Sequence, residues 1–242
     1  MARNAGLEAA RGRYIAFLDA DDVWMPDKLA VQCELLDRCS DAGLVYTRFG
    51  VIDDAGRVQS RGHTYLTSKP SGAILRYLLA GNVIGTPSTI CFRRDLIEND
   101  TIRFDDTDTH LEDWHFFLRV ATRTRIRYQP RTLAYHRQHS RNMGGHVSAC
   151  MTRNLRTGQF ALDLARKHLK LDEREIRRVE RRMRAYAEAL AAREYVKAGK
   201  MAQARNHAAR SLIHYPWNLR EATLYLLALI GWVPWAIRRR LK

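Results

Sequence analysis

The sequence contains few cysteines, and they are not arranged as metal-binding proteins arrange theirs. The 242 residues include four cysteines, at positions 33, 39, 91 and 150, and no two of them form a C-x-x-C pair. Structural zinc sites usually rely on such pairs, and small secreted proteins rely on many cysteines for a disulfide framework. The sequence therefore points away from both kinds of stabilisation and fits a protein of a reducing cytosol.

Long apolar segments are also scarce. The N-terminal residues Met1–Gly6 form no apolar core of a signal peptide. Residues 222–237 lack charge and precede a basic end, but as a helix they would span only ~24 Å. The hydrocarbon core of a bilayer measures ~30 Å, and Gly231 and Pro234 weaken such a helix further. We expect an interfacial anchor or a buried helix here, not a membrane span.

Acidic residues are in the minority. Lys and Arg total 41 against 26 Asp and Glu, which gives a net charge of +15. Many of the basic residues lie between Thr152 and Arg210, on apparent helices. They are either solvated helix faces or a surface that lies against an anionic membrane. No zinc finger, recognition helix or RNA-binding motif accompanies the charge, so we expect no nucleic-acid partner.

Three carboxylates follow a short apolar run near the N-terminus. Tyr14–Leu18 is rich in strand formers and predicts a central strand, buried on both faces of a parallel sheet; Asp19, Asp21 and Asp22 come directly after it. Open α/β sheets bind ligands at this end of a strand. The carboxylates repel one another unless a cation or hydrogen-bond donors lie close. The alternative is a turn that caps the next helix.

The surrounding segment resembles the signature of the family 2 glycosyltransferases, "RN.G...ARG.YIAFLDADD.W.P.KL..Q". The match keeps its spacing over about thirty residues, and consists of Arg3-Asn4-Ala5-Gly6, Ala10-Arg11-Gly12, Tyr14–Asp22, Trp24, Pro26, Lys28-Leu29 and Gln32. The resemblance implies a GT-A fold, in which a D-x-D element lies beside a sugar diphosphate.

The resemblance also assigns roles at the donor end. Asp21 would contact a divalent cation, Mg²⁺ or Mn²⁺, that bridges the two phosphates, with Asp22 beside it. Asp19 would lie nearer the ribose or sugar, and Asn4 and Arg11 would lie close to the donor. A helix-surface arginine is an equally good interpretation of Arg11.

A second acidic cluster opens a predicted helix at residues 111–122. Phe104-Asp105-Asp106, Glu112-Asp113-Trp114 and Phe117-Leu118-Arg119 together resemble the family's "FDE.....ED.DL.LR". The resemblance assigns Asp113 as the general base that takes the acceptor's proton, with Glu112 as its neighbour. A metal at the leaving diphosphate and a base at the acceptor would give in-line displacement with inversion. The alternative is that both acids cap the helix.

A third cluster ends the strand-forming part of the chain. Residues 135–142 resemble the family's "YR.H..N.S", with Arg137, His139 and Asn142 as the matching positions. Such a basic segment could close over the diphosphate. The alternative is a polar loop exit.

Two strands that begin family members, similar to "VSVVIPTYN" and "VDDGSTD", have no match here. We therefore predict an α/β, partial GT-A domain over residues 1–140. A basic helical region follows over residues 141–242, ending in an amphipathic or apolar helix. Within that region the pattern around Gly199, a helix, a turn and an Ala-rich helix, resembles a tetratricopeptide hairpin.

The resemblance thus implies a glycosyltransferase, or a fragment of one, that acts in cell-envelope polysaccharide synthesis. It would use a nucleotide-sugar donor and a glycan, lipid-linked or protein acceptor. We expect it in the cytoplasm, peripheral on the inner face of the membrane. The first alternative is an inert remnant that serves as a helical scaffold or binds a membrane surface. A basic nucleic-acid-binding module ranks third.

Overall fold

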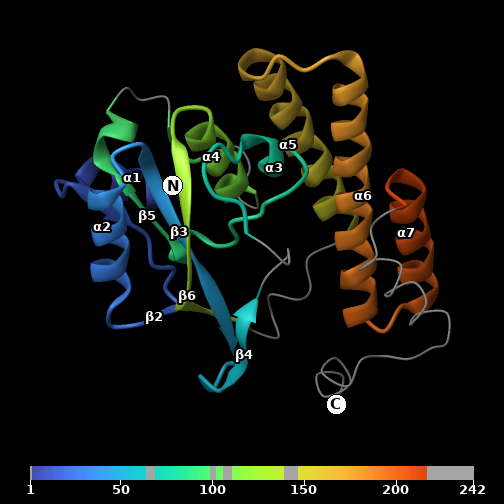
Figure 1. Cartoon of the computed structure of the whole chain (residues 1–242). Coiled ribbons are helices and arrows are strands. Elements are labelled where there is room, and N and C mark those ends of the chain that lie inside the picture. The colour runs from blue at the N-terminus through green and yellow to red at the C-terminus, as the bar shows by residue number, and fades with distance from the viewer. Residues whose placement is uncertain (1, 64–68, 99–101, 106–110, 139–146, 217–242) are drawn as a thin grey trace. The chain divides into compact units, whose positions relative to one another are not determined.

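The computed structural model describes residues 2–63, 69–98, 102–105, 111–138 and 147–216. The chain separates into two compact units (Figure 1). The first, here called the α/β unit, comprises Met1–Leu78 and Asn82–His139. The second, the helical unit, comprises Leu79–Gly81 and Ser140–Lys242. An α/β region followed by a helical region is the fold class that the sequence predicted, and it is confirmed.

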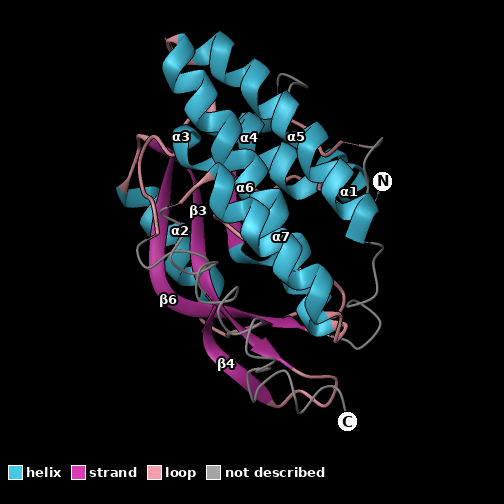
Figure 2. Cartoon of the chain, turned by 90° about the vertical axis from the view of Figure 1, so that its right-hand side faces the viewer, coloured by secondary structure: helices cyan, strands magenta, loops and turns pink. Residues whose placement is uncertain are grey.

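Within its described residues, the α/β unit is built on one mixed sheet of six strands. Figure 2 shows strands of this sheet in magenta. The strands are β1 (Tyr14–Ala16), β2 (Val23–Trp24), β3 (Ala42–Ile52), β4 (Val58–His63), β5 (Ile90–Arg93) and β6 (Arg125–Arg137). Their order is β1-β5-β3-β6-β2, and β4 also pairs with β3. The pair β3 and β6 is parallel, and the others are antiparallel.

The prediction for the first strand was wrong. Among the described residues β1 lies at one end of the strand order, pairs antiparallel with β5, and buries only Ile15. Leu18, expected inside the sheet, lies beyond the strand and is 50% exposed. The error has a physical reason: a short apolar run predicts a strand, but it does not distinguish a central strand from an edge strand.

Strand β3 is the centre of the sheet. Ten of its eleven residues are buried, and β-branched and aromatic side chains suit such a position. A hairpin follows it: Gly56, at φ +78°, makes the turn into β4. The remaining elements of this unit are α1 (Ala2–Ala9), α2 (Lys28–Arg38), α3 (Leu75–Leu78), η1 (Pro87–Thr89), η2 (Arg94–Ile97) and α4 (Glu112–Ala121).

Helix α4 contributes several large apolar side chains to the core. Its residues from Trp114 to Leu118 are all buried, so it is covered on more than one face. Phe116 stacks on Phe104 with ring centroids 4.4 Å apart, and the indole nitrogen of Trp114 donates to the carbonyl of Leu78. This packing fixes the start of α4, where the acidic pair lies.

Two polar residues of the matched signature turn out to be structural. Lys28 is fully buried; its Nζ donates to Oε1 of Gln32 at 2.5 Å and to the carbonyl of Ile90 at 3.2 Å. The amide of Gln32 in turn donates to carbonyls of β3 and η1. Burial lowers the pKa of Lys28 to about 8. These bonds hold α2 on the sheet, directly after the carboxylate turn.

The helical unit consists of α5 (Val147–His168), α6 (Glu173–Lys197) and α7 (Met201–His214). A capping box between Asp172 and Glu175 begins α6. Gly199, at φ +71°, ends it and allows the turn into α7. Small residues let these two helices approach: Ala204 and Ala208 are buried. The likeness of this hairpin to a tetratricopeptide unit stays a prediction.

Within the described ranges, none of the helices combines the length and the apolar composition needed to cross a membrane. The predicted apolar run at 222–237 lies outside the described residues.

Candidate active site

The carboxylates after β1 lie in a tight turn beside η1. The backbone N–H of Asp22 donates to the carbonyl of Asp19 at 3.0 Å. The N–H of Asp19 donates to Oγ of Ser88, also at 3.0 Å. The hydroxyl of Thr86 lies 3.3 Å from Oδ2 of Asp19 and 3.4 Å from Oδ2 of Asp22. Residues 86–88 therefore provide hydrogen-bonding groups that allow these acids to lie together.

Asp22 is the most buried of the three acids, and protein groups occupy its carboxylate. Its Oδ1 lies 2.9 Å from Nδ1 of His136 and accepts from the N–H of Arg137 at 3.0 Å. Burial by itself would raise the pKa of Asp22, but hydrogen bonds from His136 and Ser88 outweigh it, so the pKa is lowered. The same bond raises the pKa of His136. Asp22 thus ties the turn to the end of β6.

Arg137 makes a second tie at the same place. Its Nε donates to the carbonyl of Asp21 at 2.8 Å, and its Nη1 donates to those of Asp53 and Asp54 at 2.9 and 3.3 Å. These bonds join the carboxylate turn to the β3–β4 hairpin. The predicted closure over a diphosphate stays a prediction, and its other residues, His139 and Asn142, lie outside the described residues.

Arg3 connects the two acidic clusters. Its Nη2 lies 2.6 Å from Oδ1 of Asp19, and its Nη1 lies 2.6 Å from Oε1 of Glu112. All three side chains are at most 27% exposed, so the two ion pairs are less screened than surface pairs. The turn after β1 and the start of α4 are far apart in sequence, and this guanidinium makes them one site.

The other two N-terminal residues expected near the donor have structural contacts. Asn4 makes two hydrogen bonds with the backbone of Phe104, which fasten α1 to the segment before α4. Arg11 is exposed and donates to the carbonyl of Glu8 at the end of α1. The structure therefore brings Asp19, Asp22 and Glu112 together through side-chain contacts, while the contacts of Asn4 and Arg11 lie within or beside α1.

Asp113 has the most altered acidity in the site. Burial, and next the charge of Glu112, raise its pKa to about 7, against the opposing effects of the Trp114 N–H and of Arg3. Its Oδ1 accepts from the N–H of Trp114 at 2.6 Å, and its Oδ2 accepts from Nδ2 of Asn82 at 3.0 Å. A carboxylate with this pKa exchanges its proton near neutral pH, as a general base must.

The donor-side acids fit a shared cation better than a cage of protein ligands. Within the described part of the chain, no group of three or more His, Cys, Asp or Glu side chains is placed to hold a metal ion. The carboxylate of Asp22 is occupied by His136, and that of Asp19 is paired with Arg3. One or two carboxylates are enough for Mg²⁺ or Mn²⁺ when phosphate oxygens complete the coordination. Asp21, partly exposed in the same turn, suits that arrangement.

Sequence reasoning missed three residues of this site. Thr86 and Ser88 precede β5 in a stretch without a recognisable motif, and Asn82 begins that stretch. Asn, Gly, Thr-Pro and Ser in succession are typical of a turn, and this signal could have placed a loop there. It could not have shown that the loop contacts both acidic clusters.

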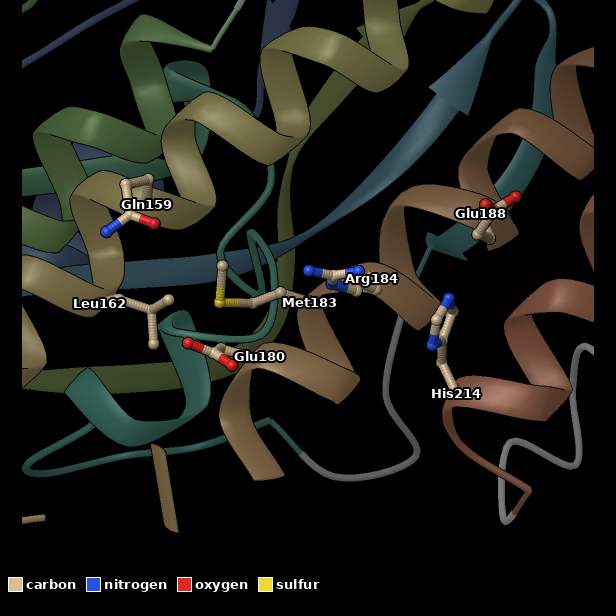
Figure 3. A pocket seen from close by; sticks show the side chains of 7 residues that line it. All are labelled: Gln159, Leu162, Glu180, Met183, Arg184, Glu188 and His214. Atoms are coloured by element: carbon tan, nitrogen blue, oxygen red, sulfur yellow. The ribbon is translucent and has the colours of Figure 1, made fainter. Parts of the chain in front are cut away.

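A pocket of about 380 Å³ lies elsewhere, within the helical unit (Figure 3). Its lining comes from α5, α6 and α7, and consists of Gln159, Leu162, Glu180, Met183, Arg184, Glu188 and His214. Glu188 is buried and lies 2.6 Å from Nδ1 of His207. None of the residues predicted for sugar transfer lines this pocket, so its position does not mark the site.

Comparison with known proteins supports the predicted family. The family model described as glycosyl transferase family 2 matches residues 1–100. The amylovoran biosynthesis glycosyltransferase AmsB of Erwinia amylovora is 31% identical over 126 residues, which cover 49% of this chain and 40% of that protein. The putative glycosyltransferase EpsH of Bacillus subtilis is 31% identical over 141 residues, 55% of this chain and 40% of that protein.

A shorter match has a higher sequence identity. The putative teichuronic acid biosynthesis glycosyltransferase TuaG of Bacillus subtilis is 58% identical over 36 residues, 15% of this chain and 14% of that protein. The chain spans about two-fifths of the length of AmsB and EpsH. The resemblance predicted from the signature is thus confirmed: residues 1–100 match the model of glycosyl transferase family 2, and the matched relatives are named glycosyltransferases.

Proposed function

We propose that this protein transfers a sugar from a nucleotide-sugar donor to an acceptor hydroxyl, by a metal-assisted displacement that inverts the anomeric centre. One observation carries the proposal: Arg3 pairs with both Asp19 and Glu112 at 2.6 Å, so the D-x-D turn and the acidic pair belong to one site. A donor-binding end and a proton-accepting end are what such a displacement requires.

At the donor end, Asp19 and Asp21 would face the nucleotide diphosphate. Asp21 would hold the divalent cation, and Asp19, fixed by Arg3, would contact the ribose or the sugar. When bound, Mg²⁺ or Mn²⁺ supplies positive charge where the leaving diphosphate develops negative charge. Thr86 and Ser88 keep the turn in shape through their hydrogen bonds with Asp19.

At the acceptor end, Asp113 takes the proton of the attacking hydroxyl as the new glycosidic bond forms. Its pKa of about 7 leaves much of it ionised at neutral pH and makes it a stronger base than an ordinary aspartate. Glu112, paired with Arg3, holds the start of α4 in place instead. Attack from the side of Asp113, opposite to the leaving diphosphate, inverts the configuration.

Calorimetry with nucleoside diphosphates tests the donor end. UDP, GDP and dTDP are titrated into the full chain with Mn²⁺, or with EDTA in its place. We expect one of them to bind only with metal, and Asp21→Asn to remove that binding. Asp53→Asn is the matched control, because Asp53 lies in the β3–β4 hairpin and pairs with Arg57. Metal-independent binding, or equal binding by Asp21→Asn, contradicts the proposed role of the metal and of Asp21. Absence of binding by all three nucleotides favours a remnant that acts as a scaffold.

The names of two relatives indicate a class of acceptor. AmsB and TuaG carry names that refer to amylovoran and teichuronic acid biosynthesis. We propose that the acceptor here is likewise a growing glycan, free or lipid-linked, of a cell-envelope polysaccharide. A protein acceptor is the alternative. A screen of undecaprenyl-linked sugars against peptides with the donor found by calorimetry separates the two.

The helical unit suggests where the reaction takes place. Arg174, Arg177, Arg178, Arg181 and Arg184 are all exposed on α6 and recur at the spacing of one helix face. Anionic headgroups attract such a stripe by about 1 kcal/mol per residue near the surface. We therefore propose that the protein is cytoplasmic and peripheral on the inner face of the membrane, where a lipid-linked acceptor is within reach. Solvation of the same arginines is the alternative.

A further inference from the structure

The loop that contains Asn82, Thr86 and Ser88 contacts both ends of the proposed site. Thr86 and Ser88 bond to the carboxylate turn through Asp19, and Asn82 bonds to Asp113 at the start of α4. This loop is therefore a second link between the two acidic clusters, independent of Arg3.

The amide of Asn82 uses all of its hydrogen-bonding capacity. Its Oδ1 accepts from the N–H groups of Ile84 at 3.1 Å and Gly85 at 2.9 Å. Its Nδ2 donates to the carbonyl of Gly85 at 2.8 Å and to Oδ2 of Asp113 at 3.0 Å. An amide has two N–H donors and one oxygen with two lone pairs, so the set is complete.

These backbone bonds also decide which way the amide faces. Two N–H groups point at one atom of the Asn82 side chain, so that atom must be the oxygen. The NH₂ group is then left facing Asp113. The loop is held in this shape by Gly85, whose φ of +112° suits glycine and where a Cβ would lie 2.7 Å from the ring of Phe49. The hydrogen-bond donor of Asn82 is therefore held in position before any ligand binds.

We propose that Asn82 is the positioning residue of the base: its amide fixes the orientation of the Asp113 carboxylate and favours the ionised form. The role of Asp113 as a base rests on the proposed function. The hydrogen bond between Asn82 and Asp113 does not depend on it. Asn82 does not itself touch the reacting atoms, and acts through Asp113.

The effect of Asn82 is set against the other groups that face Asp113. Glu112 on α4 and Asp19 after β1 disfavour its ionised form, whereas Arg3 on α1 and the Trp114 N–H favour it. Arg3 is shared between two other carboxylates. The Nδ2 donor of Asn82 is thus the side-chain hydrogen bond that the structure gives to this carboxylate. A hydrogen bond to a charged group stabilises it enough that its loss raises a carboxyl pKa by about one unit, a tenfold change in proton affinity.

Two substitutions test this, with a matched control. Asn82→Asp keeps the oxygen that accepts from Ile84 and Gly85, but replaces the donor with a like charge. Asn82→Ser removes the amide without adding charge. Asn4→Ser is the control, since it removes another amide of the unit, one that bonds to Phe104 and not to Asp113. The full chain is labelled with ¹³C at its aspartate carboxyls, and Asp113→Asn assigns the signal of Asp113.

The midpoint of the Asp113 titration is the measured quantity. We expect it to rise by about one unit in Asn82→Ser and by more in Asn82→Asp, and to move little in Asn4→Ser. Equal midpoints in wild type and both Asn82 variants overturn the inference. A raised midpoint in a protein that transfers no sugar upholds the positioning of Asp113 and counts against the proposed function instead.

A measurement on the wild type covers the case in which the variants do not fold. The side-chain ¹⁵N signal of Asn82 should titrate with the midpoint of Asp113, because its N–H bonds to the group that changes charge. In Asp113→Asn this step should disappear. An Asn82 signal that stays constant through the Asp113 titration overturns the inference as well.

Discussion

Charged residues are used differently in the two parts of the chain. Residues 1–138 contain 19 Lys and Arg and 18 Asp and Glu, whereas residues 147–216 contain 16 basic and 7 acidic residues. In the α/β unit, several of these charges are partly buried and paired, as in Arg3 with Asp19 and Glu112. In the helical unit, the arginine stripe of α6 is exposed. Charge in the first unit builds a site; charge in the second is available to a partner.

The two units also differ in what packs them. The α/β unit packs large side chains, such as Trp114, Phe116 and Tyr46, around one sheet. Between α6 and α7, small residues dominate, and Ser211 donates its hydroxyl to the carbonyl of Ala185. Because Arg3, Asp19 and Glu112 are paired and partly buried, substituting them should affect both function and stability. Substituting exposed charges of the second unit should affect stability little.

The largest expected effect is on catalysis, at Asp113. In the full chain, Asp113→Asn should lower kcat for sugar transfer by about 10²–10⁴, the usual worth of general base catalysis, while donor binding persists. Steady-state kinetics with the donor found by calorimetry measures both. Glu112→Gln is the control and should cost less, because Glu112 pairs with Arg3 and is not the base. If Asp113→Asn were fully active and Glu112→Gln inactive, Glu112 and not Asp113 would be the general base.

The next effect is on stability, at Arg3. Arg3→Met should lower the free energy of unfolding by about 1–3 kcal/mol, because two partly buried carboxylates lose their cation. Urea unfolding followed by tryptophan fluorescence measures it. Arg13→Met is the matched control: its pair with Asp37 is largely exposed, at 69% and 49%, and should cost less than about 1 kcal/mol. Equal losses in both variants would show that Arg3 is only a surface charge.

The raised pKa of Asp113 has a signed effect on stability. Its folded pKa of about 7 lies above the ordinary value of 3.8, so between these values the folded state binds more protons than the unfolded state. The free energy of unfolding should therefore fall as pH rises from about 4 to about 7, and stay reduced above that. The loss is on the order of 2–4 kcal/mol.

Comparing wild type with Asp113→Asn at pH 5 and pH 8 isolates this effect. The free energy of unfolding of the variant should increase relative to that of the wild type as pH rises. The pKa of His136 is raised by its bond to Asp22, so the contribution of His136 to stability is also lost as pH rises. That contribution is common to both proteins and cancels in the difference. A difference that does not change between pH 5 and pH 8 would contradict the raised pKa of Asp113.

The smallest effect on stability is expected in the helical unit. Replacing the five arginines of the α6 stripe by glutamine should abolish flotation with phosphatidylglycerol vesicles. Stability should change by less than about 0.5 kcal/mol per site. Replacement by lysine should preserve binding, because it keeps the charge. Glutamine and wild-type proteins that float equally would show that the stripe is only a solvated helix face.

Much of the fold could be predicted from local patterns. Runs of strand-forming residues at 44–47 and 89–93 lie within β3 and at β5, and the predicted helix at 111–122 is α4. Two further runs of strand-forming residues, 126–128 and 133–136, belong to one long strand, β6. The apolar pattern at 71–80 favours a helix over that whole segment, but the helix is limited to Leu75–Leu78. Periodicity locates such elements, but their lengths depend on pairing with residues distant in sequence.

Within the site, the same division holds. The signature showed where the two acidic clusters lie, since spacing is a property of the chain. It did not indicate that Lys28 and Gln32 are buried and that their hydrogen bonds connect α2 to the sheet, or that Asn4 fastens α1 to Phe104. A motif records which residues recur together, and it does not separate residues that hold the fold from residues that contact a ligand.

The sequence by itself determined the resemblance of its first part to family 2 glycosyltransferases, the two acidic clusters, and the contrast in charge between a balanced first part and a basic second part. Only the tertiary structure decided that Arg3 and the loop of residues 82–88 join those clusters, and that burial and Glu112 raise the pKa of Asp113 to about 7. The physical reason is that composition and spacing are local. Acidity depends on solvent exclusion and on charges brought close by folding, from α1 and from the loop before β5.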